Sequence, residues 1–214
     1  MAVQVSNVVN RAKRILQDTT GIRWPDLELL DWLNDGQREV VMMAPQAGAA
    51  TVQVALQNDS RQTIPNDGTQ FLKLVRNVAG RAIRQTQQAV LDSQIPDWHS
   101  ATDEEVMHYT FDPVDPRSFY VYPRGTKQVE LVYTRAPEPA VADGNLTIPD
   151  IYANAVLDYV LYRAYSKDAE ETANRELANI HYMRFVESLG LKAQVDNAIA
   201  MAQSSVTRAS NVGS

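Results

Sequence analysis

Residues 151–165 read IYANAVLDYVLYRAY, and apolar or aromatic side chains occupy nearly every face of the helix that this segment predicts. Four tyrosines, Tyr152, Tyr159, Tyr162 and Tyr165, lie on more than one of those faces. A helix that is apolar all round must be buried on several sides. Because a small domain has difficulty surrounding one helix, we assign these four tyrosines to an interface with a neighbouring subunit.

Further helices are expected on both sides of this segment. A helix over residues 169–188 follows it, with Gly190 as the natural break at its end. Near the start of the chain, residues 6–17 carry apolar side chains at helical spacing, and a second helix opens at Pro25 and ends before Pro45. We expect these N-terminal and C-terminal helices to pack into one bundle.

Between the two pairs of helices, the period of the apolar residues changes from about 3.6 to two. Apolar and polar residues alternate over residues 52–56, 107–111, 119–122 and 129–133, and Asn66-Asp67-Gly68 indicates a tight turn. This spacing predicts a small antiparallel β domain, a barrel or a sandwich, inserted between the helices. The expected fold class is therefore α+β.

The expected organisation has four parts. Residues 1–47 form the N-terminal part of the helical bundle, and residues 48–140 form the β-rich insertion. Residues 141–203 form the C-terminal part of the bundle, and residues 204–214 form an extended arm.

The expected arm has too little apolar content to fold by itself. Its sizeable apolar side chains are Val206 and Val212, and its one charged residue is Arg208. We expect these three residues to become ordered on a partner, by pairing with an exposed strand edge or by lying in a groove.

The composition excludes several classes of protein. Of 214 residues, 44% are hydrophobic and 21% are charged, and the net charge of -6 argues against a protein whose main task is to grip a phosphate backbone. The absence of cysteine excludes disulfides, thiolate nucleophiles and cysteine zinc sites. No secretory signal opens the sequence and no apolar run is long enough to span a bilayer, so we expect synthesis in the cytoplasm and no membrane partner.

No catalytic, metal or cofactor motif is evident. His99, His108 and His181 lie far apart, and none has the i, i+4 partner of a metal-binding helix. Neither a glycine-rich phosphate loop nor a Gly-x-Ser-x-Gly motif occurs. We therefore expect no catalytic residue, no cofactor and no metal ligand.

Acidic residues offer the alternative of an enzyme. They gather at residues 103–105 and at Asp112 and Asp115, and a glycan hydrolase needs two carboxyl groups across a cleft with separated pKa values. Adjacent acids on a polar loop are more typical of a solvated surface. A virion-associated glycan hydrolase of the carboxylate type remains the alternative from a different class.

Four segments occur in an order that resembles a known family. They are LLDWLNDGQREV at residues 29–40, LD at 91–92 followed by IPDWH at 95–99, FYVYP at 119–123 and LYRAYSKDAE at 161–170. Together they resemble the head-to-tail adaptor proteins of short-tailed bacteriophages, whose known members combine a helical bundle with a projecting sheet domain.

The resemblance implies a structural protein of the virion neck, made in the host cytoplasm. It implies a ring of identical subunits, typically dodecameric, that lies beneath the portal protein, links it to the tail nozzle protein and continues the DNA channel. Double-stranded DNA would pass through the lumen without specific binding, because an acidic protein repels it. The portal is then the expected partner of the arm. Another tail ring subunit, in the tail tube, terminator or nozzle, is the nearest alternative.

Overall fold

The computed structural model describes residues 2–210 and divides the chain into two compact units. The first, here called the helical unit, comprises Met1–Ala44 and Pro137–Ser214. The second, the β unit, is the intervening segment Pro45–Ala136. The expected α+β class is confirmed.

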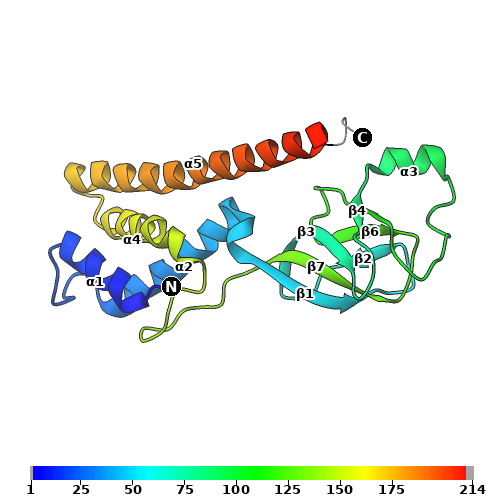
Figure 1. Cartoon of the computed structure of the whole chain (residues 1–214). Helices are drawn as coiled ribbons and strands as arrows, with labels where there is room; N and C mark the ends of the chain where they lie inside the picture. Colours follow the sequence, from blue (N-terminus) through cyan, green and yellow to red (C-terminus); the bar gives the residue numbers. More distant parts are fainter. Residues whose placement is uncertain (1, 211–214) are drawn as a thin grey trace. The chain divides into compact units, whose positions relative to one another are not determined.

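In the helical unit, helix α4 lies between two layers of other helices. Helices α1 and α2 pack on one side of α4, and α5 packs on the other (Figure 1). The elements are α1 (Val5–Ile15), α2 (Asp26–Met43), the 3₁₀ turn η2 (Asp150–Tyr152), α4 (Ala153–Lys167) and α5 (Thr172–Ser210).

Helices α2 and α4 run antiparallel to each other. Lys167, at the end of α4, donates a 2.7 Å hydrogen bond to Glu28, near the start of α2. Further along α2, Gly36 lies against Tyr159 in the first half of α4, so closely that a Cβ at Gly36 would be 3.0 Å from the Tyr159 ring. The glycine therefore permits the close approach of the two helices.

Helix α5 is antiparallel to α4 as well. The ring of Tyr165 stacks on His181 with centroids 5.7 Å apart, and the ring of Tyr159 meets Phe185 at 5.3 Å. Earlier residues of α4 therefore contact later residues of α5, as expected for antiparallel helices. Since α2 and α5 both oppose α4, they run parallel to each other within one chain.

Helix α5 continues through Gly190, where the sequence predicted a break. A Cβ added at Gly190 would meet no atom within 4 Å, so the residue lies on the open side of the helix. A helix that has already nucleated gains one hydrogen bond for each further residue, and glycine costs only about 1 kcal/mol relative to alanine. The neighbouring Leu189 is buried, and its packing offsets that cost.

The expected extended arm is wrong for residues 204–210, which form the end of α5. The expectation rested on too little apolar content, but elongation of an existing helix needs no burial and no new nucleus. Val206 and Arg208 lie in this helical segment, and Val212 lies outside the described residues. No helix within residues 2–210 is long and apolar enough to cross a membrane.

The β unit contains two sheets. The first has the strand order β1-β7-β3 and the second β2-β6-β5-β4, and all pairs are antiparallel except β4 with β5. The elements are η1 (Pro45–Gly48), β1 (Ala49–Ala55), β2 (Arg61–Thr63), β3 (Gly68–Asn77), β4 (Arg84–Gln85), α3 (Gln88–Gln94), β5 (His108–Thr110), β6 (Ser118–Tyr122) and β7 (Gln128–Arg135).

Aromatic residues from both sheets meet in the core of the β unit. Phe71 on β3 stacks on Phe119 on β6 with centroids 4.6 Å apart, and it meets the edge of Tyr109 on β5 at 5.6 Å. Leu131 and Val129 on β7 are completely buried in the same cluster. The two sheets thus share one core.

The turn at residues 66–68 is present, with the N–H of Gly68 bonded to the carbonyl of Pro65 at 2.9 Å. It does not form a hairpin, because β2 pairs with β6 and β3 pairs with β7. A Cβ at Gly68 would lie 2.6 Å from the ring of Tyr133, so only glycine fits where the chain crosses between the sheets.

Candidate assembly surfaces

The four tyrosines assigned to a subunit interface all lie in or next to α4. Tyr152 and Tyr159 are only 3% and 7% exposed, whereas Tyr162 and Tyr165 are partly exposed. Helices of the same chain, α1, α2 and α5, supply the burial that we had expected from a neighbouring subunit. Tyr152 and Tyr159 therefore have little exposed surface for contact with another copy. A role for Tyr162 and Tyr165 at a subunit interface stays a prediction.

Tyr159 joins α4 to α2 through its hydroxyl. Arg163 donates a 3.2 Å hydrogen bond to that hydroxyl and also lies 3.3 Å from the carboxylate of Asp35 on α2. Burial raises the pKa of Tyr159, and the hydrogen bond from Arg163 partly offsets this effect. The tyrosine is thus neutral and acts as a structural link.

Two buried amides of α2 hold the segment that leads into α4. Asn34 accepts a 2.8 Å hydrogen bond from the N–H of Ala140 and donates a 3.2 Å bond to the carbonyl of the same residue. Gln37 accepts from the N–H of Thr147 at 2.8 Å and donates to the Asn34 side chain at 3.2 Å. Buried amides need such partners, so these bonds fix the path of the chain over α2.

Large apolar side chains remain exposed on both outer layers of the helical unit. Leu27 and Met42 on α2 are 75% and 70% exposed. On α5, Ile180, Leu191 and Val195 are 46%, 55% and 56% exposed. Apolar side chains that recur along one face of a helix indicate a contact surface when they form a patch.

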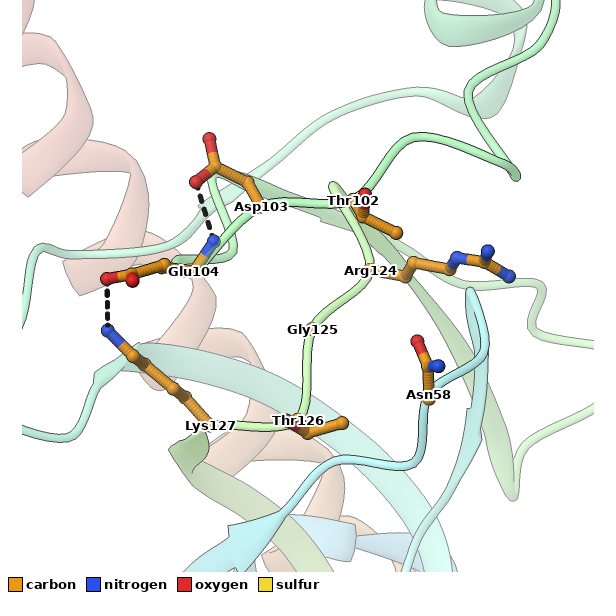
Figure 2. Close-up of a pocket in the computed structure, with 8 residues that line it drawn as sticks. All are labelled: Asn58, Thr102, Asp103, Glu104, Arg124, Gly125, Thr126 and Lys127. Atoms are coloured by element: carbon orange, nitrogen blue, oxygen red, sulfur yellow. Dashed lines mark hydrogen bonds and ion pairs between the residues drawn. The ribbon is translucent and has the colours of Figure 1, made fainter.

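Asp103 and Glu104 of the β unit line an open hollow of about 610 Å³ (Figure 2). The carboxylate of Asp103 accepts the N–H of Glu104 at 2.6 Å, and Glu104 pairs with Lys127 at 2.9 Å. Glu104 raises the pKa of Lys127, which therefore stays charged. Figure 2 shows both acids on the same side of the hollow, and the side chain of Arg124 points away from them. This is the geometry of solvated ion pairs.

Asp112 and Asp115 lie on the loop before β6. The carboxylate of Asp112 accepts the N–H of Val114 at 2.9 Å, as in a turn. Asp115 lies 2.8 Å from Arg61, and hydrogen bonds from Ser118 and Arg61 hold the pKa of Asp115 below its usual range. Asp115 is therefore ionised at neutral pH and unsuited to donate a proton.

The three histidines are in separate surroundings. His99 stacks on Trp98 with centroids 3.7 Å apart, His108 stacks on Tyr122, and His181 lies 2.8 Å from Asp158. Within the described part of the chain, no three histidine or acidic side chains gather closely enough to hold a metal ion.

A sequence model of a known family, described as SU10 adaptor protein, matches residues 3–209 and thus spans both units. The chain belongs to the SU10 adaptor protein family. A search of curated proteins finds no match. Membership confirms the resemblance to phage adaptors that the sequence suggested, and it supports a general role as an adaptor in a phage virion.

In this SU10 adaptor, the segments that carried the resemblance make stabilising contacts within each of the two units. Residues 29–40 contain the amides Asn34 and Gln37, and residues 161–170 contain Lys167, which bonds to Glu28. In the β unit, Trp98 is completely buried, and its indole N–H donates a 2.9 Å bond to Asp92.

Our reading of the sequence of this SU10 adaptor missed the outward-facing apolar residues of α2 and α5. These apolar residues recur at helical spacing, 15 residues apart from Leu27 to Met42 and 11 residues apart from Ile180 to Leu191. The stronger apolar faces of the same helices, which pack on α4, obscured it.

Proposed function

We propose that this chain is a head-to-tail adaptor that forms a ring, typically dodecameric, beneath the portal protein. The ring links the portal to the tail nozzle protein and continues the DNA channel. The observation that carries the proposal is the family match across both units. Exposed apolar residues on both outer layers of the helical unit support self-association, because a ring needs two different surfaces on each copy.

The charge of the chain suits a channel. Acidic residues outnumber basic ones, 26 to 20, so a lumen with the same balance would present like charge to DNA. DNA is expected to pass without specific binding, since tight binding would need neutralisation of phosphates by lysine and arginine.

Contact with the portal through residues 204–214 remains part of the proposal, in an amended form. Val206 and Arg208 would meet the portal from the helical end of α5, and Val212 from the segment after it. Deletion of residues 204–214 should abolish co-sedimentation with portal rings of the same phage while the remaining chain stays folded. Unaltered binding by the shortened chain would remove these residues from the portal interface.

The ring itself is tested by electron microscopy of the purified chain mixed with portal rings of the same phage. We expect a closed ring of adaptor subunits on one end of the portal. A chain that stays monomeric and does not bind the portal would refute the proposal. A ring located elsewhere in the tail would favour a tail tube, terminator or nozzle subunit.

The absence of catalysis is also a proposal, and Glu104 and Glu105 provide its test. Glu104 pairs with Lys127, and Glu105 lies 3.7 Å from Arg81. Replacing both acids with glutamine should leave assembly and infection unchanged. Hydrolysis of cell-wall glycan by the wild-type chain that disappears in the double variant would instead support the hydrolase alternative.

A further inference from the structure

Helix α2 carries a stripe of exposed residues opposite its buried side, here called the α2 stripe. It consists of Leu27, Asp31, Arg38 and Met42. The buried residues of α2, such as Leu29, Leu33 and Val40, face α4 and the rest of the core. The stripe has apolar ends and two charges of opposite sign between them.

Helix α5 carries a second stripe, the α5 stripe, beside the face that packs on α4. It consists of Ile180, Arg184, Leu191 and Val195, all of them exposed. Glu187 lies on the same side of the helix, one turn before Leu191, and is also exposed. Residues three, four and seven apart share one side of a helix, so the members form one continuous surface.

The two stripes have the same spacing, because successive members are separated by four, seven and four residues in both. Each stripe therefore extends about 22 Å along its helix. When the two helices are aligned in parallel, two apolar pairs match, Leu27 with Ile180 and Met42 with Val195. The oppositely charged Asp31 and Arg184 match as well. Arg38 then lies beside Leu191, with Glu187 one turn away.

The charges that this alignment brings together mostly have no protein partner in one copy. Among the residues that the structure describes, the carboxylates of Asp31 and Glu187 and the guanidinium of Arg184 have no hydrogen bond or ion pair. Arg38 has only a surface ion pair with Asp35, at 3.1 Å. Opposite charges at matched positions select a partner and a register.

The antiparallel alignment of the same stripes is unfavourable. Matching the apolar ends in that direction puts Arg38 opposite Arg184 and Asp31 opposite Leu191. Two like charges would face each other, and the Asp31–Arg184 pair would be lost. The charges therefore favour the parallel direction.

In a ring, α5 of one copy can lie parallel to α2 of the next copy. Helices α2 and α5 run parallel within one chain and lie on opposite sides of α4. Neighbouring copies in a ring are related by rotation, so the α5 layer of one copy can meet the α2 layer of the next with the direction kept.

We propose that the α5 stripe of one copy packs in parallel against the α2 stripe of the next copy, with Asp31 paired to Arg184. The inference rests on the proposed ring, and it deepens it by assigning the two surfaces of the contact. The contact uses a different face of each helical unit and is therefore heterologous, as a closed ring requires.

Cysteine cross-linking tests the register, because the natural chain contains no cysteine. One preparation carries Leu27→Cys alone and another carries Ile180→Cys alone, and the two are mixed with portal rings before oxidation. We expect covalent dimers in the mixture and none in either preparation by itself. The matched control pairs Leu27→Cys with Val195→Cys, which only the antiparallel alignment would join, and should give no dimer.

Charge reversal tests the same contact without cross-linking. Asp31→Arg or Arg184→Asp alone should raise the concentration needed for half-maximal ring assembly, roughly two- to fivefold for an exposed pair. The double variant, which has the net charge of the wild type, should restore assembly. Because both side chains are free in one copy, the single variants should keep the unfolding transition of the wild type.

The outcomes separate this inference from the proposed function. Normal rings on the portal, with no dimers from the Leu27 and Ile180 preparations and no rescue in the double variant, would overturn the stripe contact and leave the adaptor ring intact. A wild-type chain that forms no ring and does not bind the portal would overturn both. Dimers in the antiparallel control would replace the proposed register.

Discussion

Replacing Asn34 with alanine should strongly destabilise the helical unit. Asn34 is 9% exposed, and its side chain makes three hydrogen bonds, two to the backbone of Ala140 and one to Gln37. Alanine keeps the helix of α2 intact, because it is the best helix former. The change therefore removes the polar link between α2 and the segment that leads into α4, and little else.

The expected loss follows from the groups left behind. Ala140 is 5% exposed, so its N–H and carbonyl would remain buried without the partner that Asn34 provides. Each lost bond contributes about 0.5–1.5 kcal/mol, and a buried group left unsatisfied costs about 1–3 kcal/mol. Some relaxation of the segment toward water will reduce the total, so we expect a loss of about 2–4 kcal/mol in the free energy of unfolding.

Urea denaturation and amide hydrogen exchange measure the effect. The urea midpoint should fall, and the amides of Ala140 and Thr147 should exchange faster, since both bond to this pair of side chains. Asn145→Ala, an exposed asparagine on the same segment, is the control and should change little. A loss below about 0.5 kcal/mol for Asn34→Ala, with the Ala140 amide still protected, would refute the reasoning.

Three further predictions follow from single residues. Gly190→Ala should raise the midpoint of thermal unfolding and stabilise α5 by up to about 1 kcal/mol, because the added Cβ meets no atom within 4 Å; no gain would mean that the helix bends or ends at Gly190. Leu161→Ala should lower the free energy of unfolding by about 2–5 kcal/mol in urea titrations, since Leu161 is completely buried, and a loss below about 1 kcal/mol would contradict that burial. The carboxylate of Asp18 accepts hydrogen bonds from the backbone N–H of Trp24 and of neighbouring residues, and these bonds lower the pKa of Asp18. The stabilisation by Asp18 is therefore complete above the ordinary carboxyl pKa near 4 and is lost as the pH falls through the lowered pKa. The difference in urea midpoint between wild type and Asp18→Ala should shrink below about pH 4, and a difference independent of pH would contradict this.

The sequence predicted the elements with strong periodicity. The apolar repeat in the first forty residues places α1 and α2, and the alternation at residues 52–56 and 129–133 marks β1 and β7. These patterns depend on which face of an element is buried, and this information is local to the element. The α+β class follows from them.

Other features depend on tertiary contacts that periodicity does not encode. The turn at residues 66–68 is a correct local reading, yet β2 and β3 enter different sheets because Gly68 lets Tyr133 pack against the turn. Gly190 stays helical because nothing in its surroundings favours an end. The sequence predicted a helix buried on several sides, and α2 and α5 of the same chain cover most of α4, while Tyr162 and Tyr165 stay partly exposed.

The candidate surfaces were harder to predict for a related reason. The tyrosines of α4 attract attention because they are large and clustered, whereas the exposed residues Leu27 and Ile180 look ordinary one at a time. Their relation becomes visible only when the structure shows that α2 and α5 run parallel on opposite sides of α4. The direction of α2 relative to α5 is set by the path of the backbone through the connecting loops, which the periodicity of the sequence does not reveal.

The division of the helical unit between the two ends of the chain has a consequence during synthesis. The β unit, Pro45–Ala136, is complete as soon as its last residue leaves the ribosome, and it can fold there as a unit. Helices α1 and α2 emerge first but must wait for α4, which ends at Lys167, and at ordinary elongation rates this delay after Ala136 is roughly 2–6 s. During that interval the apolar faces of α1 and α2 are open to chaperones. Of the two proposed contact surfaces, the α2 stripe is made before the β unit and the α5 stripe after it, so a nascent chain carries only one of the two until α5 has emerged.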